Sequence, residues 1–370
     1  MTVHKETAEK AKEKVRQVLE KKVEKDKYLH NAFLLVHSDI LGIHWNFACG
    51  MSGTENKVPT TIEHTYHIAS IGKTFTSVLI GMLYEKGLID YNDPIENYLP
   101  VDIMENLHVY NGKAYSDEIL IRHLLNHTSG IPDYFSEKPK RGERILDLIL
   151  TEPSHFWTPQ ETIQWAKDNL EAHFPPSKGF YYSDTGYQLL GLIIENITEK
   201  KLHDVLHTYI FHPLGLKHSY QLFYSNPQEK SPFPIANIYV GAHDVTTYRS
   251  LSVDWAGGGI ISTTEDLFLF IKALVTQTLI KGKTFNKMKD WAKFGRGIYY
   301  GYGLMYFKFR EVFFLLSDKL DMWGNSGSIG SYMYYCPRLD VYIIGNFNQM
   351  KYGKKHVRFI IRVLNILSKL

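Results

Sequence analysis

The sequence predicts an α+β fold, in which a mainly antiparallel sheet flanked by helices is built from both chain ends and a mostly helical region is inserted between them. Three observations support this prediction. A helical segment with one apolar stripe precedes two strand-like segments near the N-terminus. Short helical segments separated by turn residues fill the middle of the chain. Strand-like segments and a closing helix follow from residue 299 onward.

Length and composition describe a globular protein with a large core. The 370 residues exceed the usual size of a single core, and 44% are hydrophobic while 22% are charged. We expect one interleaved catalytic unit, with a sheet region at residues 1–75 plus 285–370 and a mostly helical region at 76–284. The net charge is only +3, with basic residues scattered among acidic ones, so no nucleic-acid partner is expected.

The N-terminal part begins with a helix. Apolar residues recur at helical spacing among Lys and Glu in residues 4–25, and two strands are expected at 31–38 and 42–51. Residues 1–27 contain no apolar core of the signal-peptide type, and the chain has no apolar run of membrane-spanning length. We therefore expect a cytoplasmic protein without stable membrane insertion.

The middle and C-terminal parts differ in pattern. Apolar spacing and turn residues predict helices at 117–126, 145–150, 154–172, 188–197, 203–211 and 267–274. Short aromatic segments predict strands at 301–309, 312–317, 332–336 and 341–347. A closing helix at 356–370 has most of its apolar residues on one face, which favours packing against the sheet. The two cysteines, Cys49 and Cys336, are expected to be buried thiols.

A serine and a lysine three residues apart are the first candidate for chemistry. Ser70 opens a segment that stays compatible with a helix as far as Lys86, so Ser70 and Lys73 would be neighbours on one helical face. A serine hydroxyl is a weak nucleophile until an adjacent group takes its proton, and a lysine one turn away can do so. The segment lies where a polar loop becomes a helix, which offers backbone N–H groups to an anion.

Other motifs in the sequence are weaker. Gly72 to Thr74 resembles the end of a phosphate-binding loop, but that loop needs a glycine where His67 stands. His203 and His207 have the spacing of zinc ligands on a helix, yet no third ligand is evident, and no metal is expected.

Two other catalytic arrangements, a compact triad and a nucleophile elbow, fit the sequence poorly. His127, Ser129 and Asp133 supply the residue types of a catalytic triad, but a loop this compact cannot easily place them in relay geometry. The chain has no Gly-x-Ser-x-Gly sequence, which excludes the α/β-hydrolase route to an esterase.

Three motifs together resemble those of one family. Ser70-Ile71-Gly72-Lys73, Tyr182-Ser183-Asp184 and Asn325-Ser326-Gly327 stand in order along the chain. The sequence thereby resembles the class C β-lactamase-like serine hydrolases, which include D,D-carboxypeptidases, D-aminopeptidases and β-lactamase-like esterases. The resemblance runs from about residue 32 to 349, with further landmarks at 124–130, 213–216 and 258–263.

The resemblance implies a fold and a mechanism. The fold would be that of the β-lactamases and the transpeptidase units of penicillin-binding proteins, with the site in the cleft between the two regions. Ser70 would attack an ester or amide carbonyl and form an acyl-enzyme, while Lys73 and Tyr182 would relay its proton. Either of these two could be the formal base, and register favours Tyr182 over Tyr181. The backbone N–H groups of Ser70 and Ser328 would form the oxyanion hole, and no cofactor is implied.

Two departures from the family pattern bear on the substrate, which Asp184, Asn325, Ser326 and Gly327 are expected to contact. Neutral Asn325 replaces a Lys or His that helps to bind a substrate carboxylate, which weakens the case for efficient β-lactamase activity. Asp184 replaces an Asn. Its carboxylate could face Lys73 and shift the base role toward Tyr182, bind a substrate amine, or only cap a helix that starts at Thr185.

The function expected from the sequence is a cofactor-independent serine hydrolase acting on a small-molecule ester, amide or peptide. A weak β-lactamase or a D,D-carboxypeptidase is the alternative within the same family. A catalytically idle binding protein on the same fold is the alternative of another class, because Asn325 and Asp184 both break the pattern, whereas the retained Ser70, Lys73 and Tyr182 argue against it.

Overall fold

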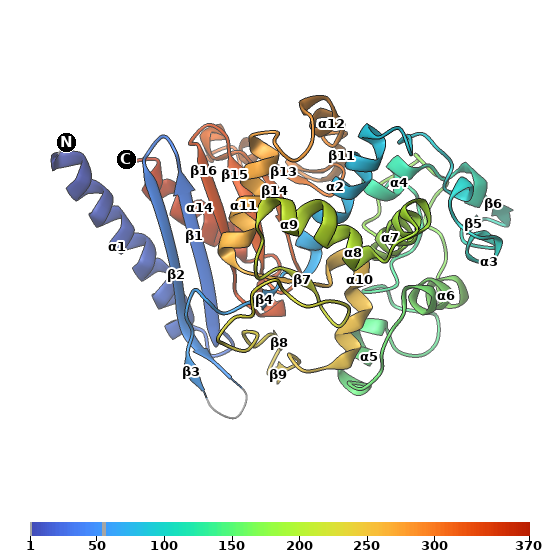
Figure 1. Cartoon of the computed structure of the whole chain (residues 1–370), viewed down its shortest axis with the longest axis horizontal. Coiled ribbons are helices and arrows are strands. Elements are labelled where there is room, and N and C mark those ends of the chain that lie inside the picture. The colour runs from blue at the N-terminus through green and yellow to red at the C-terminus, as the bar shows by residue number, and fades with distance from the viewer. Residues whose placement is uncertain (1, 54–56) are drawn as a thin grey trace.

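A nine-stranded antiparallel sheet dominates the computed structural model, which describes residues 2–53 and 57–370 (Figure 1). The strand order is β11-β12-β13-β14-β15-β16-β1-β2-β3, so strands from both chain ends share one sheet. The strands are β1 (Asn31–Ser38), β2 (Ile43–Ser52), β3 (Val58–Pro59), β11 (Ala292–Gly295), β12 (Ile298–Tyr300), β13 (Met305–Phe307), β14 (Met322–Ser326), β15 (Tyr332–Cys336) and β16 (Val341–Asn346). This architecture confirms the predicted α+β class.

The central strand β1 is apolar on both faces. It pairs with β16 on one side and with β2 on the other, so that Leu35 lies opposite Ile344 and Asn46. Successive side chains of a strand point to opposite faces. Leu34 therefore packs in the core cluster on one face of the sheet, and Leu35 packs in the cluster on the other. A strand buried on both faces explains the continuous apolar sequence of this segment.

Helices from the two chain ends cover the outer face of the sheet. Helix α1 (Thr2–Lys25) and helix α14 (His356–Leu367) contact each other, and the two termini lie at the same end of the molecule in Figure 1. Val15 and Leu19 of α1 and Ile360 and Val363 of α14 are at most 1% exposed. The prediction that the first and last helices pack against the sheet is confirmed.

The opposite face of the sheet carries helix α11 (Thr264–Val275), and beyond it lies the helical region. This region positions the polar residues described below. Its helices are α2 (Gly72–Glu85), α3 (Val101–Met104), α4 (Ile121–Leu125), α5 (Ile145–Thr151), α6 (Pro159–Asn169), α7 (Asp184–Thr198), α8 (Leu202–Leu206), α9 (His212–Leu214) and α10 (Trp255–Gly258). The division into units at 1–75 plus 285–370 and 76–284 stays a prediction.

The remaining elements are short. A three-stranded sheet has the order β4-β10-β7, from β4 (Tyr66–His67), β10 (Ile260–Ser262) and β7 (Tyr220–Gln221), and two hairpins pair β5 (Val109–Tyr110) with β6 (Lys113–Ala114) and β8 (Tyr239–Val240) with β9 (His243–Asp244). Helix α12 (Gly282–Lys287) precedes β11. The three-stranded sheet was not predicted, because strands of two or three residues are too short to show a period of two.

One predicted strand is wrong. Residues 312–317 were expected to be a strand, but the chain forms the short helix α13 (Phe309–Val312) followed by a loop. Phe314 and Leu315 in this loop are 69% and 71% exposed. An apolar sequence forms a strand only where a neighbouring strand pairs with its backbone. The cysteine prediction holds fully only for Cys336, since Cys49 is partly exposed.

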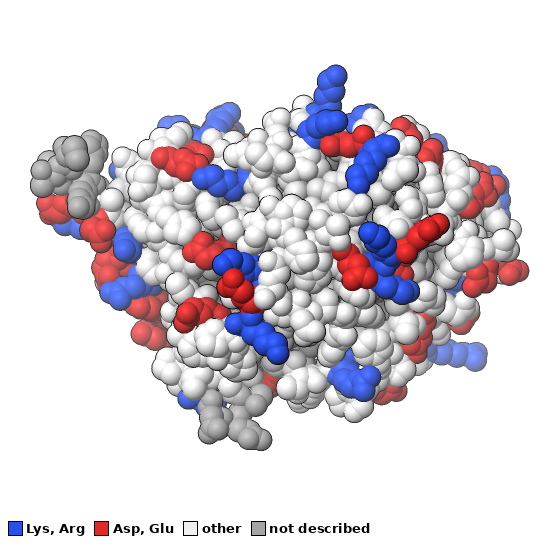
Figure 2. All heavy atoms as spheres, viewed as in Figure 1, with Lys and Arg blue, Asp and Glu red and all other residues white. Residues whose placement is uncertain are grey.

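The surface and the helix lengths complete the description. On the face that Figure 2 shows, Lys and Arg side chains are interspersed with Asp and Glu, without a large patch of either sign. Within residues 2–53 and 57–370, no helix combines the length and the apolar composition that a bilayer crossing requires.

Candidate active site

Ser70 lies in a single 3-10 turn (Ala69–Ile71) directly before helix α2. The preceding Ala69 has φ +48°, in the left-handed region that residues with a Cβ rarely occupy. Gly327, at the end of β14, packs against this turn so closely that a Cβ on it would lie 2.7 Å from the Cβ of Ala69. The close packing of Gly327 therefore holds the strained turn against the sheet. Backbone strain of this kind is concentrated at functional sites.

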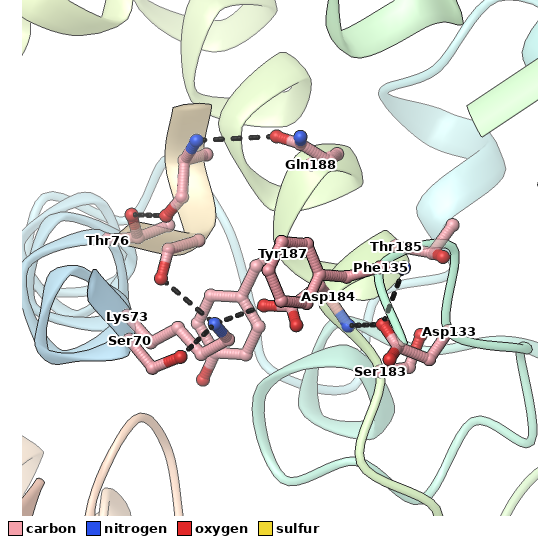
Figure 3. A network of polar contacts seen from close by, with 12 residues as sticks. Ser70, Lys73, Thr76, Asp133, Phe135, Ser183, Asp184, Thr185, Tyr187 and Gln188 are labelled. Atoms are coloured by element: carbon pink, nitrogen blue, oxygen red, sulfur yellow. Dashed lines mark hydrogen bonds and ion pairs between the residues drawn. The ribbon is translucent and has the colours of Figure 1, made fainter. Parts of the chain in front are cut away.

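Lys73 lies one turn along the same helical face, as the spacing predicts. Its side chain is 0% exposed, and its Nζ donates hydrogen bonds to Ser70 Oγ at 3.1 Å and to the Gly257 carbonyl at 2.9 Å. The Lys73 ammonium also forms an ion pair with the Asp184 carboxylate, and Figure 3 shows its nitrogen between the Ser70 and Asp184 oxygens. All three acceptors of this buried ammonium are therefore identified.

The charge state of Lys73 follows from its neighbours. Burial acts to lower its pKa, but the nearby Asp184, Tyr182 and Asp254 outweigh burial and raise the pKa above its ordinary value. Lys73 is consequently an ammonium at neutral pH. In the resting site the Lys73 ammonium donates a hydrogen bond to Ser70 Oγ and cannot accept its proton.

Tyr182 is the tyrosine that lies beside Ser70 and Lys73. Lys73 Nζ lies 5.2 Å from the centre of its ring, and Tyr182 and Ser70 line the same cavity. Tyr181 instead stacks on His173, with the ring centres 3.5 Å apart. Burial raises the pKa of Tyr182, although Lys73 acts in the opposite direction. The register that favours Tyr182 over Tyr181 thus agrees with the geometry.

His127 supports Tyr182. Its ring centre lies 4.2 Å from that of Tyr182, and its Nδ1 accepts a hydrogen bond from the Ser183 N–H at 3.1 Å. Burial lowers the pKa of His127 well below its ordinary value, so the ring is neutral. Ser129 Oγ accepts a hydrogen bond from the Ile131 N–H at 3.3 Å, and Asp133 accepts one from the Asp184 N–H at the start of helix α7. These residues do not form the relay that their types would allow.

The third motif, which begins at Asn325 in strand β14, is hydrogen-bonded to the turn that carries Ser70. Asn325 is 1% exposed, and its amide donates to the Gly303 carbonyl at 3.0 Å and to the Ser70 carbonyl at 3.2 Å. Its own Oδ1 accepts from the Ser326 N–H at 2.8 Å. Ser326, Gly327 and Ser328 line the cavity beside Ser70. At the position where the family pattern has a Lys or His, this chain thus has the neutral Asn325, whose amide already has hydrogen-bond partners in the protein.

Asp184 does not act as a cap. Ser183 occupies the position before α7 without a side-chain capping bond, and Asp184 is the first residue of the helix. The Asp184 N–H donates to Asp133 Oδ1 at 2.9 Å, while the Asp184 carboxylate faces Lys73 (Figure 3). Of the sequence alternatives, the capping role is wrong and the inward orientation is confirmed.

Two further carboxylates belong to the site: Asp133, which the sequence offered only as part of a triad, and Asp254, which no motif indicated. Asp133 and Asp254 line the cavity with Asp184. Burial raises the pKa of Asp133 to about 6 and that of Asp254 to about 7, and the Asp184 charge adds to both shifts. Asp254 directly precedes the run Trp255 to Gly259, whose glycines were noticed as a landmark. A carboxylate placed before small residues is the signal that could have identified it.

The cavity in front of Ser70 has a volume of about 570 Å³. Its wall contains polar residues, Ser70, Tyr182 and Asp184 among them, and a large apolar part. The apolar residues are Phe135, Leu146, Phe294, Ile298, Met305, Phe307, Met350 and Val357. The site therefore suits a substrate with a large apolar group and a polar reacting end.

The Gly258→Ala variant is expected to damage this site. A Cβ at Gly258 would lie 2.3 Å from Asp254 Oδ2 and 2.6 Å from the Ala69 carbonyl carbon. Overpacking of this kind costs about 1–3 kcal/mol and would displace the turn that carries Ser70. We expect a lower melting temperature and slower labelling of Ser70 by a fluorophosphonate. Gly295→Ala, where nothing lies within 4 Å of the added carbon, is the control; equal behaviour of the two variants would contradict the expectation.

Comparison with known proteins places these motifs in context. The family model described as Beta-lactamase matches residues 23–365. Penicillin-binding protein 4* of Bacillus subtilis is 29% identical over 286 residues, which cover 70% of this chain and 56% of the relative. The human mitochondrial serine beta-lactamase-like protein LACTB is 26% identical over 289 residues, covering 62% and 51%. The chain thus spans about half the length of these curated relatives.

Solved structures match over more of their length. The D-stereospecific amidohydrolase from Streptomyces sp. has a TM-score of 0.75 and 26% identity, covering 94% of this chain and 96% of that one. The D-amino acid amidase from Ochrobactrum anthropi SV3, in complex with L-phenylalanine, has a TM-score of 0.79 and 25% identity, covering 97% and 99%. The fold is therefore shared with these proteins over nearly the whole length of both chains.

Proposed function

Because the chain belongs to the Beta-lactamase family of serine hydrolases, we propose that it cleaves an amide or ester bond through an acyl-enzyme formed on Ser70. The observation that carries this proposal is the contact of 3.1 Å between Lys73 Nζ and Ser70 Oγ beside the Tyr182 ring. It brings a nucleophile together with two groups that can move its proton. No cofactor is part of the proposal.

The proposed chemistry starts from a site in which both proton carriers are protonated. Once Tyr182 has lost its own proton, the adjacent Lys73 ammonium stabilises the phenolate, and this phenolate takes the proton of the Ser70 hydroxyl as the Ser70 oxygen attacks the carbonyl. The backbone N–H groups of Ser70 and Ser328 hold the oxyanion, and Tyr182 returns the proton to the leaving group. Water then hydrolyses the acyl-enzyme. The Asp184 carboxylate keeps Lys73 charged, which assigns the base role to Tyr182.

This assignment predicts activity that increases with pH. The pKa of Tyr182 is raised by burial and that of Lys73 by its carboxylate neighbours, so the basic form of either group becomes populated only at alkaline pH. We expect kcat/KM for an uncharged ester to rise steadily from neutral pH into the alkaline range. A plateau that is reached below neutral pH would show that neither group is the base. Stability must be measured alongside, so that alkaline unfolding is not mistaken for a loss of the base.

The substrate proposal is a small amide or ester with a large apolar group. Its support is the apolar cavity wall, together with the amidases among the structural neighbours, one of which was solved with phenylalanine bound. Phenylalanine amide, in both enantiomers, and simple phenyl esters are the first compounds to test for hydrolysis. Release of ammonia or phenol that depends on Ser70 would support the proposal. No turnover and no adduct with a fluorophosphonate would overturn it in favour of an idle binding protein.

A β-lactam activity is the second candidate. It is favoured by the likeness to penicillin-binding protein 4* and by Lys354, the one lysine among the residues that line the cavity, which could attract a substrate carboxylate. Asn325 argues against it, because its amide is engaged within the protein and carries no charge. Intact-protein mass after incubation with a penicillin separates the two candidates, since only a penicillin-recognising site gains the mass of the antibiotic.

A further inference from the structure

Asp254 lies in the cavity without a partner of its own. It is the last residue of a 3-10 segment (Arg249–Asp254) and precedes α10 without a side-chain capping bond. Within residues 2–53 and 57–370, no protein group donates a hydrogen bond to its carboxylate, which is partly exposed in the wall of the cavity. Lys73 is the nearby cation, but its hydrogen bonds go to other groups. A carboxylate that is largely removed from water and has no hydrogen-bond donor destabilises the fold, and such groups are concentrated at functional sites.

The other two carboxylates of the cavity already have a partner in the protein, Asp184 an ion pair and Asp133 hydrogen bonds. Asp184 is paired with the Lys73 ammonium. Asp133 accepts from the Asp184 N–H at 2.9 Å and from the Ser136 N–H at 3.0 Å, and the Ser136 hydroxyl also donates to it. Lys73 in turn gives its remaining hydrogen bonds to Ser70 and Gly257. Among the described residues that line the cavity, Asp254 is thus the carboxylate with neither an ion-pair partner nor a hydrogen-bond donor in the protein.

Glycines bring this carboxylate close to the nucleophile. A Cβ built on Gly258 would lie 2.3 Å from Asp254 Oδ2 and 2.6 Å from the Ala69 carbonyl carbon. The distance between Asp254 Oδ2 and the Ala69 carbonyl carbon is therefore less than about 5 Å. Ala69 directly precedes Ser70. The absence of side chains at Gly257 and Gly258 leaves the space that the Asp254 carboxylate occupies.

From this geometry we infer that Asp254 binds the ammonium group of the substrate, so that the preferred substrates are amides or esters of α-amino acids with a free amine. In such a molecule the nitrogen is two bonds from the carbonyl carbon that Ser70 attacks. A carboxylate within a few ångströms of the nucleophile is placed to receive it, and a charge-assisted hydrogen bond gives both affinity and orientation. The apolar wall accommodates the side chain of the same amino acid. This inference rests on the proposed hydrolase function and states which substrates that hydrolase prefers.

The test compares two substrates that differ only in the amine. Phenylalanine p-nitroanilide carries an ammonium group, and phenylpropanoic acid p-nitroanilide is the same molecule without it. We expect the wild type to prefer the first, and Asp254→Asn to reduce the ratio of the two kcat/KM values about 10- to 100-fold. Asp147→Asn removes the same charge from a surface pair with Arg144 and is expected to keep the ratio.

Each outcome distinguishes the inference from the underlying function. If Asp254→Asn lowers both kcat/KM values by the same factor, Asp254 acts on the nucleophile rather than on the amine, and the inference is overturned. A wild type that cleaves the neutral anilide as well as the charged one overturns it too, while the hydrolase function stands. If neither compound is cleaved and Ser70 takes up no fluorophosphonate, the proposed function itself fails. Thermal melting of each variant verifies that it is folded.

Discussion

Ser70→Ala is expected to lose the fluorophosphonate adduct and to reduce turnover by about 10⁴-fold or more. The hydroxyl accepts a hydrogen bond from Lys73, which keeps partners at Asp184 and Gly257 when the hydroxyl is removed. The variant should therefore remain folded, with a melting temperature close to that of the wild type. Intact-protein mass and the rate of ester hydrolysis measure the two effects.

The control for this variant lies on the same helix. Ser77→Ala removes a buried hydroxyl that pairs with the Tyr187 hydroxyl at 3.1 Å, far enough along α2 that it does not line the cavity. It is expected to cost about 1 kcal/mol of stability and to keep the adduct. An adduct that persists in Ser70→Ala, located by peptide mass on another residue, would contradict the assignment of the nucleophile.

Lys73→Met is expected to abolish turnover and also to destabilise the fold. The substitution leaves Asp184 without its ion-pair partner and Asp254 without the nearby buried cation that favours its charged form. Removal of one partner of a buried ion pair typically costs about 3–5 kcal/mol. Unfolding in denaturant, monitored for the variant and the wild type, gives this difference directly.

The loss of stability in Lys73→Met should depend on pH. Burial already raises the pKa of Asp254 to about 7 in the wild type, where Lys73 acts to lower it, and without the cation this pKa rises further. A carboxyl whose pKa is higher in the folded state than in the unfolded state destabilises the fold increasingly as pH rises between the two values. The variant should therefore be closest to the wild type near pH 4 and furthest from it above pH 7.

A surface lysine provides the comparison for this variant. Lys272 pairs with Asp39 at 3.0 Å, and the two side chains are 32% and 59% exposed. Exposed ion pairs contribute about 0–1 kcal/mol, so Lys272→Met should have little effect at any pH. Equal losses in the two variants, or a loss in Lys73→Met that is the same at pH 4 and above pH 7, would show that the buried carboxylates do not respond to Lys73.

The sequence predicted the structure well where a continuous apolar segment or a short motif determined it. β1 was predicted at its observed bounds because it is apolar on both faces, and Ser70 and Lys73 were predicted as neighbours because helical spacing alone brings them together. The segment at 312–317 was mispredicted for the opposite reason. Its apolar residues lie in a loop, and only the position of neighbouring strands decides that.

Asp254 shows what spacing cannot reveal. It is separated from Ser70 by 184 residues in the sequence, and its relation to the nucleophile depends on how closely α10 approaches the turn that carries Ser70. Asp184 was found because it stands inside a motif, but its choice between capping a helix and facing Lys73 depended on tertiary contacts. The polar residues that accompany the motifs, rather than the motifs themselves, distinguish this site.

The pairing of β1 with β16 has a consequence for biosynthesis. The two strands lie side by side in the sheet but are separated by roughly 300 residues of chain. At a ribosomal speed of about 5–20 residues per second, one edge of β1 waits roughly 15–60 s for its partner. During that interval an apolar strand edge is available to other nascent chains. The central sheet is therefore completed only late in translation, and one edge of β1 stays unpaired until β16 has emerged.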